Sequence, residues 1–256
     1  MGLNLSEEFE SLVTEISRQS LKLDGKNEEE RLYKGIALYF FAKGRKTYQS
    51  IKLLCLDKLA EDASVLTRSL FEMVVDLVYV GQEPSRRVLY CEYEIIQKVK
   101  LHRKLEEGKK KNDPWCIKIL ASKGQAQLEA ELKEYERVKG NYPNKDRWSG
   151  ESRKDIAEKI GMGWQYNYVY FILSALAHTS PTAVDSYLRF NTSGTLEYRN
   201  SEPGDVERVW NTASIYFLII INCLNDAFRL CLDDKIKKID DLIQREFPTC
   251  KGGGES

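Results

Sequence analysis

Four residues of this 256-residue chain have the types and spacing that acid–base or phosphate chemistry requires. Arg68 and Glu72 stand four residues apart in the stretch LAEDASVLTRSLFEMVVDLVYVG, residues 59–81. Ser174 and His178 are also four residues apart, in a second stretch that ends in SALAHTS. Residues four apart on a helix lie on one face, one turn after the other. Each pair is therefore predicted to present both side chains on the same side of its helix.

The helix predicted over residues 59–81 is apolar around most of its circumference. At 100° per residue, the side opposite Arg68 carries five apolar side chains: Leu66, Leu70, Met73, Val74 and Leu77. An apolar arc this wide predicts a central helix that contacts more than one neighbour. Glu72 and Tyr79 lie within about 40° of Arg68. The Arg68–Glu72 pair is then an exposed ion pair contributing under about 1 kcal/mol, a buried structural pair or a functional pair.

If the two helices face each other, Arg68, Glu72, Ser174 and His178 form one polar centre. An imidazole is the side chain best suited to general acid or base catalysis at neutral pH. A guanidinium beside it would stabilise the charge of a phosphate or another anion. Glu72 is expected to orient the imidazole, and no metal or other cofactor is expected, because the chain has two histidines and no CxxC pair.

Three functions are compatible with such a centre. The first is a metal-independent phosphodiesterase, most simply a ribonuclease that acts as a toxin or phage-defence effector. The second is a module that binds a small anionic or aromatic ligand or a protein partner. Its predicted ligand contacts are Trp164, Asn167, Tyr79 and Asn222, beside the aromatic residues Tyr168, Tyr170 and Phe171. The third is a structural polar core, in which Ser174 bonds back to its own helix and His178 complements the helix dipole.

Composition limits the partners. Lys and Arg together number 39, as do Asp and Glu, so the net charge of zero argues against bulk electrostatic attraction to nucleic acid. RNA bound at a local site or a small anion remains compatible with this charge. The polar start MGLNLSEEFE and the lack of a long apolar run predict a cytoplasmic protein with no membrane partner. The six cysteines mostly stand among apolar residues, which predicts buried free thiols. Broad apolar faces make a homodimer one expected state.

The hydrophobic periodicity predicts an all-α, multi-helix bundle in one domain over residues 1–247, followed by a disordered tail at 248–256. Asn27 and Glu30 form a capping-box-like start for one long helix. Turn residues at 193–194 between LRF and LEY predict a small hairpin or flap over residues 185–202. The last long helix is expected to run from Asp205 to about Leu232, with a charged continuation to Phe247.

Three stretches resemble a bacterial family of unknown function, the DUF5677 family: LTRSLFE (residues 66–72), RWSGESRKDIAEKIG (147–161) and SALAHTSP (174–181). The resemblance covers roughly residues 34–225. It implies a helical bundle with an Arg/Glu helix and a Ser/His helix, and it carries no established activity.

Helical-bundle ribonucleases of the HEPN type are similar in class. Their signature is an Arg four to six residues before a His on one helix. The residues before His178 read FILSALA and contain no Arg. In a HEPN-like mechanism, Arg68 would therefore have to supply the guanidinium from another helix.

Overall fold

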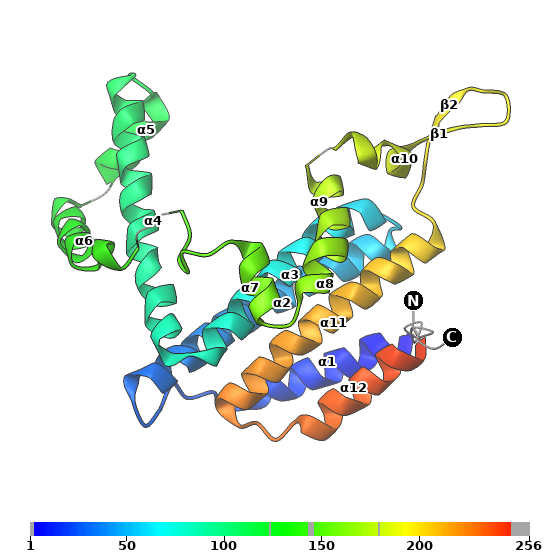
Figure 1. The fold of residues 1–256 in the computed structure, drawn as a ribbon, viewed down its shortest axis with the longest axis horizontal. Coiled ribbons are helices and arrows are strands. Elements are labelled where there is room, and N and C mark those ends of the chain that lie inside the picture. Colours follow the sequence, from blue (N-terminus) through cyan, green and yellow to red (C-terminus); the bar gives the residue numbers. More distant parts are fainter. Residues whose placement is uncertain (1–2, 123, 143–145, 179, 247–256) are drawn as a thin grey trace. The chain divides into compact units, whose positions relative to one another are not determined.

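The computed structural model describes residues 3–122, 124–142, 146–178 and 180–246. They are mostly helical, with one small hairpin, so the predicted all-α bundle and the predicted hairpin near residues 185–202 are both confirmed (Figure 1). The chain divides into two compact units, residues 1–81 with 153–256 and residues 82–152. The single domain over residues 1–247 stays a prediction, and the tail 248–256 lies outside the described residues.

The first unit holds the predicted polar centre. Its long helices are α1 (Leu3–Arg18), α2 (Glu28–Leu56), α3 (Ala60–Gln82), α11 (Pro203–Phe228) and α12 (Asp233–Glu246). Its shorter elements are α7 (Arg153–Lys159), α8 (Gly163–Gln165), the π-helical turn η2 (Tyr166–Tyr170), α9 (Phe171–Ala177), the 3-10 turn η3 (Pro181–Ala183), α10 (Val184–Tyr187), β1 (Leu188–Phe190) and β2 (Leu196–Tyr198).

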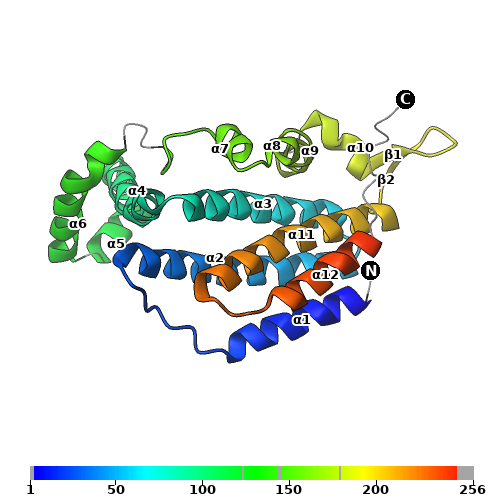
Figure 2. The same ribbon diagram turned by 60° about the horizontal axis from the view of Figure 1, so that its bottom comes forward.

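The helices α2 and α11 form the central pair of this unit, and α12 lies against α11 and α1 (Figure 2). A Cβ atom added to Gly44 of α2 would lie 3.0 Å from Ile220 Cδ1 of α11, so glycine permits this close approach. Next to it, the Tyr48 ring stacks on Phe217 at 4.7 Å and on Trp210 at 4.9 Å. These buried aromatic contacts hold the pair together.

The predicted central helix over residues 59–81 is α3. Leu70, Met73, Val74 and Leu77, expected opposite Arg68, are all buried, whereas Leu66 is only partly buried. The buried Phe71 ring contacts Tyr216 of α11 at 5.4 Å and Tyr170 of η2 at 5.5 Å. The two ring contacts confirm that α3 packs against more than one neighbour.

The end of α11 differs from the prediction, because the helix stops at Phe228 instead of continuing to about Leu232. Arg229 and Cys231 have left-handed backbone angles, with φ of 55° and 57°. The side-chain oxygen of buried Asn225 accepts a hydrogen bond from the Leu232 backbone N–H at 3.0 Å. Its amide nitrogen donates to Asp233 Oδ1 at 3.1 Å. Asn225 thus replaces helical hydrogen bonds at a turn that apolar periodicity does not reveal.

The second unit is a small helical assembly. It contains α4 (Pro84–Lys110), α5 (Pro114–Ser122), α6 (Gln125–Val138) and the 3-10 turn η1 (Lys139–Asn141). Its core is the cluster Ile96, Val99, Tyr135, Val138 and Tyr142. The Trp148 ring meets the Tyr90 ring of α4 edge to face, at a centroid distance of 5.3 Å.

The described cysteines are free thiols of unequal exposure. Burial raises the pKa of Cys55 to about 11 and that of Cys223 to about 12. Among the described cysteines, the predicted burial holds for Cys55; Cys91, Cys116 and Cys223 are partly buried, and Cys231 lies exposed in the turn between α11 and α12. Among the described helices, none is long and apolar enough to cross a bilayer.

The turn at Asn225 gives the first prediction. Asn225→Ala removes both side-chain hydrogen bonds from a buried position and is expected to lower the free energy of unfolding by about 1–3 kcal/mol. Asn222→Ala, one turn earlier on the exposed side of the same helix, should change it by less than about 0.5 kcal/mol. Urea denaturation followed by circular dichroism measures both. Equal effects of the two substitutions would contradict this role of Asn225.

Candidate functional site

The His178 helix is continuous from α8 through η2 to α9 and ends at Ala177, before Pro181. The sequence predicts a regular helix here, but Tyr166–Tyr170 form a π-helical turn. Such turns are rare and often occur at functional sites, because they rotate the side chains that follow them. This turn contains Tyr170, which contacts both α3 residues of the predicted centre.

Arg68 and His178 are in direct contact across the two helices. Arg68 Nη1 lies 2.8 Å from His178 Nε2. A guanidinium can only donate, so Nε2 accepts and the ring is the neutral tautomer with its proton on Nδ1. His178 is exposed and forms the C-cap of α9. The structure therefore brings the two principal predicted residues together at the surface of the unit.

Tyr170 links Arg68 to Glu72. Arg68 Nη2 donates to the Tyr170 hydroxyl at 2.9 Å, and that hydroxyl donates to Glu72 Oε1 at 3.1 Å. Arg68 Nε lies 3.3 Å from the same carboxylate oxygen as an ion pair, without hydrogen-bond geometry. Three side chains thus form a closed ring, and His178 contacts it through Nη1 of Arg68.

The ring rests on the apolar core. The Tyr170 ring packs on fully buried Phe71 and stacks with Tyr166 at a centroid distance of 4.8 Å. The Arg68 side chain is 19% exposed and that of Glu72 is 34% exposed, so the pair is half-buried. Its burial is intermediate between the exposed ion pair and the buried structural pair that the sequence left open. Both charged groups remain partly accessible to solvent, so a ligand can still reach them.

The model of the family of unknown function DUF5677 matches residues 34–195. The chain belongs to this family. The predicted resemblance is thereby confirmed, over a somewhat shorter segment than the expected 34–225. No curated protein and no solved structure matches the chain.

The DUF5677 segment contains a second charged pair beside the ring, which the sequence analysis missed. Arg153 Nη1 lies 2.6 Å from Asp76 Oδ1 and donates to the backbone carbonyl of Glu72 at 3.3 Å. Burial is the largest single influence and lowers the pKa of Arg153, but the charge and hydrogen bond of Asp76 together with the charges of Glu72 and Tyr170 outweigh it, so the net pKa is raised. Asp76 stands four residues after Glu72 and continues the polar stripe of α3. This spacing was the sequence feature that could have indicated the second pair.

Ser174 has the structural role that the third alternative describes. Its hydroxyl donates to the backbone carbonyl of Tyr170 at 2.6 Å, one turn earlier. This bond satisfies a carbonyl of the π-helical turn and directs the hydroxyl to the backbone. Ser174 therefore supports the position of Tyr170 in this structure.

The four residues predicted to contact a ligand lie in three different places. Trp164 and Asn167 lie exposed on the His178 helix, and the Trp164 ring meets Tyr168 at 5.3 Å. Tyr79 is buried and stands about 16 Å along α3 from Arg68, so it is not part of this centre. Asn222 lines a separate hollow of about 340 Å³ between α11 and α12. Tyr79 was grouped with Arg68 from its angular position around the helix. That angle says nothing about how deeply a side chain is buried or how far along the helix axis it lies.

In the described part of the chain, no group of three or more His, Cys, Asp and Glu side chains is placed to hold a metal ion. The polar centre instead holds one guanidinium, one imidazole, one phenol and one carboxylate. This set can bind an anion and move a proton.

The ring gives the second prediction. Tyr170→Phe removes the hydroxyl that joins Arg68 to Glu72, and it should lower the free energy of unfolding by about 1 kcal/mol. Tyr168→Phe, two residues away and 58% exposed, is the matched control and should change it by less than about 0.5 kcal/mol. Urea denaturation compares them. A Tyr170→Phe variant as stable as the control would show that the ring contributes nothing to folding.

Proposed function

We propose that the Arg68–His178 centre binds the phosphodiester of RNA and cleaves it without a metal ion. The observation that supports this proposal is the 2.8 Å contact between a half-buried guanidinium and an exposed imidazole. The guanidinium can donate to a phosphate oxygen, and a phosphate that accepted from Nη1 would replace the direct contact of Arg68 with His178.

The contacts of Arg68 suit this role. Its Nη2 and Nε sides already face Tyr170 and Glu72, which fix the plane of the guanidinium. Nη1 points to His178, so this donor is the one a phosphate would take. A pre-positioned cation stabilises the charge that develops on non-bridging oxygens in the transition state.

In the proposed reaction, Nε2 of His178 takes the proton of the ribose 2′-hydroxyl once a phosphate oxygen has replaced it as the acceptor at Nη1 of Arg68. The 2′-oxygen attacks phosphorus, the bond from phosphorus to the 5′-oxygen breaks, and water protonates the leaving oxygen. The imidazolium then returns its proton to the solvent. The products are a 2′,3′-cyclic phosphate and a 5′-hydroxyl, and no oxidant or cofactor is needed.

Glu72 has a different role from the expected one in this proposal. Glu72 was expected to orient the imidazole, whereas its side chain contacts Arg68 and Tyr170. It would hold Arg68 in place instead of orienting His178. Arg153 and Asp76 would then fix the α3 backbone at Glu72.

One observation favours a second function, the binding of a phosphate-containing ligand without cleavage. The described centre has a single histidine, and the side-chain contact of this imidazole is with Arg68 instead of with an acid that could protonate the leaving group. In that case Arg68 and His178 would recognise the ligand only. A ribonuclease, by contrast, would suit the cytoplasmic toxin or phage-defence role that the likeness in class to HEPN ribonucleases suggests.

The third prediction separates these functions. The full chain, with EDTA present, is expected to cleave a single-stranded RNA and to leave the DNA and 2′-O-methyl versions intact, because the 2′-hydroxyl is the nucleophile. His178→Ala and Arg68→Ala should each lower the cleavage rate by about a hundredfold or more. Gel electrophoresis and mass spectrometry of the products measure the rate and detect the cyclic phosphate.

His102→Ala is the matched control, because it removes the only other histidine and lies in the second unit. Its cleavage rate should equal that of the unmodified chain. Cleavage that survives both His178→Ala and Arg68→Ala would contradict the proposed centre. RNA binding that depends on Arg68 without any cleavage would favour the second function.

A further inference from the structure

The His178 helix has a surface of unusual composition. No Asp, Glu, Lys or Arg occurs between residues 163 and 184, in a chain of which 30% is charged. Its large side chains are nevertheless exposed: Trp164 64%, Tyr168 58%, Phe171 66% and Ile172 60%. Of the eighteen large apolar side chains that are exposed in the described part of the chain, nine lie between residues 164 and 198. This concentration marks one continuous segment as an unpartnered surface.

The hairpin extends the same segment. Phe190 pairs with Leu196 across the two strands, and Leu188 pairs with Tyr198. Residues two apart share a face of a strand, so these side chains lie on one side of the hairpin. Phe190 is 74% exposed and Tyr198 90% exposed. Figures 1 and 2 both show the hairpin extending beyond the helices of its unit. A two-stranded hairpin with an apolar face is marginally stable in water without a partner.

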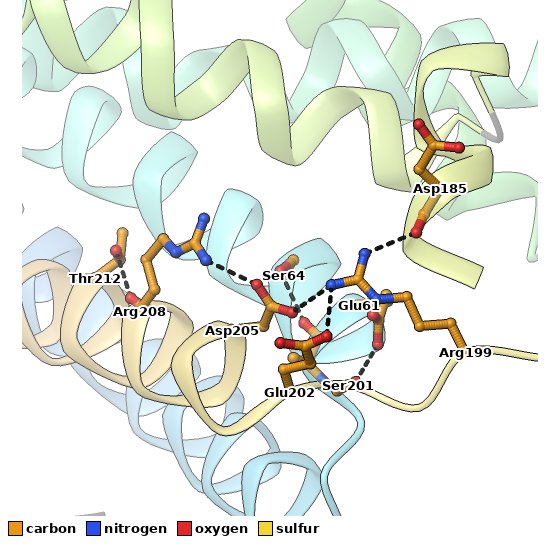
Figure 3. A network of polar contacts seen from close by, with 10 residues as sticks. Glu61, Ser64, Asp185, Arg199, Ser201, Glu202, Asp205, Arg208 and Thr212 are labelled. Carbon is orange, nitrogen blue, oxygen red and sulfur yellow. Dashed lines mark hydrogen bonds and ion pairs between the residues drawn. The ribbon is translucent and has the colours of Figure 1, made fainter. Parts of the chain in front are cut away.

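The base of the hairpin is nevertheless fixed. Arg199 donates to the backbone carbonyl of Asp185 at 2.8 Å and to Glu202 at 3.3 Å (Figure 3). Ser201 donates to Glu61 of α3 and accepts from the Ala60 backbone N–H, the latter at 3.0 Å. These bonds tie the end of β2 to the first turns of α3 and α11. The base of the exposed arm is therefore held in place, which lowers the entropy cost of binding.

We propose that the exposed apolar side chains of residues 164–172 and 184–198 form a homodimer interface whose occupant is a second copy of this chain. Depletion of charge together with enrichment in aromatic residues is the composition of an interface core. Equal numbers of acidic and basic residues mean that two copies do not repel each other at long range. The segment offers an apolar helix face and an apolar arm, and a twofold axis would let each copy supply both. Its charged residues are Asp185, Arg189 and Glu197, so it carries no net positive charge, which disfavours nucleic acid and an anionic membrane surface as occupants.

The available area fits a stable dimer. An aromatic side chain buries about 150–250 Å² when it is fully covered. The exposed fractions of the nine apolar side chains then give an apolar area on the order of 1,000 Å² per copy. Stable complexes bury about 800 Å² per partner or more. This proposal rests on exposure and composition alone and does not depend on the proposed phosphodiester chemistry.

The fourth prediction is tested by sedimentation velocity on the full chain across concentrations from about 1 to 100 μM. A dimer is expected, and Trp164→Glu should raise its dissociation constant tenfold or more, since it places a charge in the interface. Trp115→Glu is the matched control. Trp115 is 68% exposed, against 64% for Trp164, and lies in the second unit, so this variant should leave the constant unchanged.

Tyr198→Glu tests the arm separately and should weaken the dimer as well. Circular dichroism confirms that each variant is folded before it is compared. A chain that stays monomeric at every concentration would overturn the proposal. It would also be overturned by a dimer that neither Trp164→Glu nor Tyr198→Glu weakens, or by a monomer that binds phospholipid vesicles through Trp164.

Discussion

The guanidinium of Arg68 is the group on which the polar centre of the first unit depends. Its charge is half-buried on a helix whose other faces pack into the core, and an unpaired charge there would be costly. Glu72 supplies the opposite charge, Tyr170 supplies an oxygen acceptor, and His178 accepts from the remaining terminal nitrogen. Each partner comes from a position that the local backbone fixes. The contacts of the centre are therefore explained by the need to pair the charge and the N–H donors of the Arg68 guanidinium.

The surrounding structure serves the same requirement. The π-helical turn places Tyr170 over Arg68, and the hydroxyl of Ser174 satisfies the Tyr170 carbonyl within that turn. Arg153 of α7 pairs with Asp76 and donates to the Glu72 carbonyl, both on α3. The aromatic contact between Tyr170 and Phe71 connects this polar layer to the core formed by α3 and α11. A ligand that accepted from Nη1 of Arg68 in place of His178 would leave the other contacts of Arg68 unchanged.

The sequence was sufficient for the helices and for the two pairs of polar residues, because both depend on local periodicity. Arg68 and Glu72 were identified from a break in an apolar helix, and His178 from its rarity. Tyr170 was expected only as part of an aromatic wall, since a π-helical turn has no sequence signature that would predict its hydrogen bonds. Arg153 was missed because its partner Asp76 is distant in sequence. The turn at Asn225 and the depth of Tyr79 likewise depend on tertiary packing, which periodicity does not contain.

Arg68 and His178 together are proposed to form a phosphate site. NMR of the imidazole nitrogens of His178 tests this most directly. A two-histidine chain allows both rings to be observed, with His102 as the internal reference. In the free protein, Nε2 of His178 should be unprotonated and should lose its hydrogen bond in Arg68→Met. Addition of a 2′-deoxy dinucleotide, which cannot be cleaved, should shift the His178 resonances and leave those of His102 unchanged. His178 resonances that respond neither to Arg68→Met nor to the nucleotide would contradict the claim.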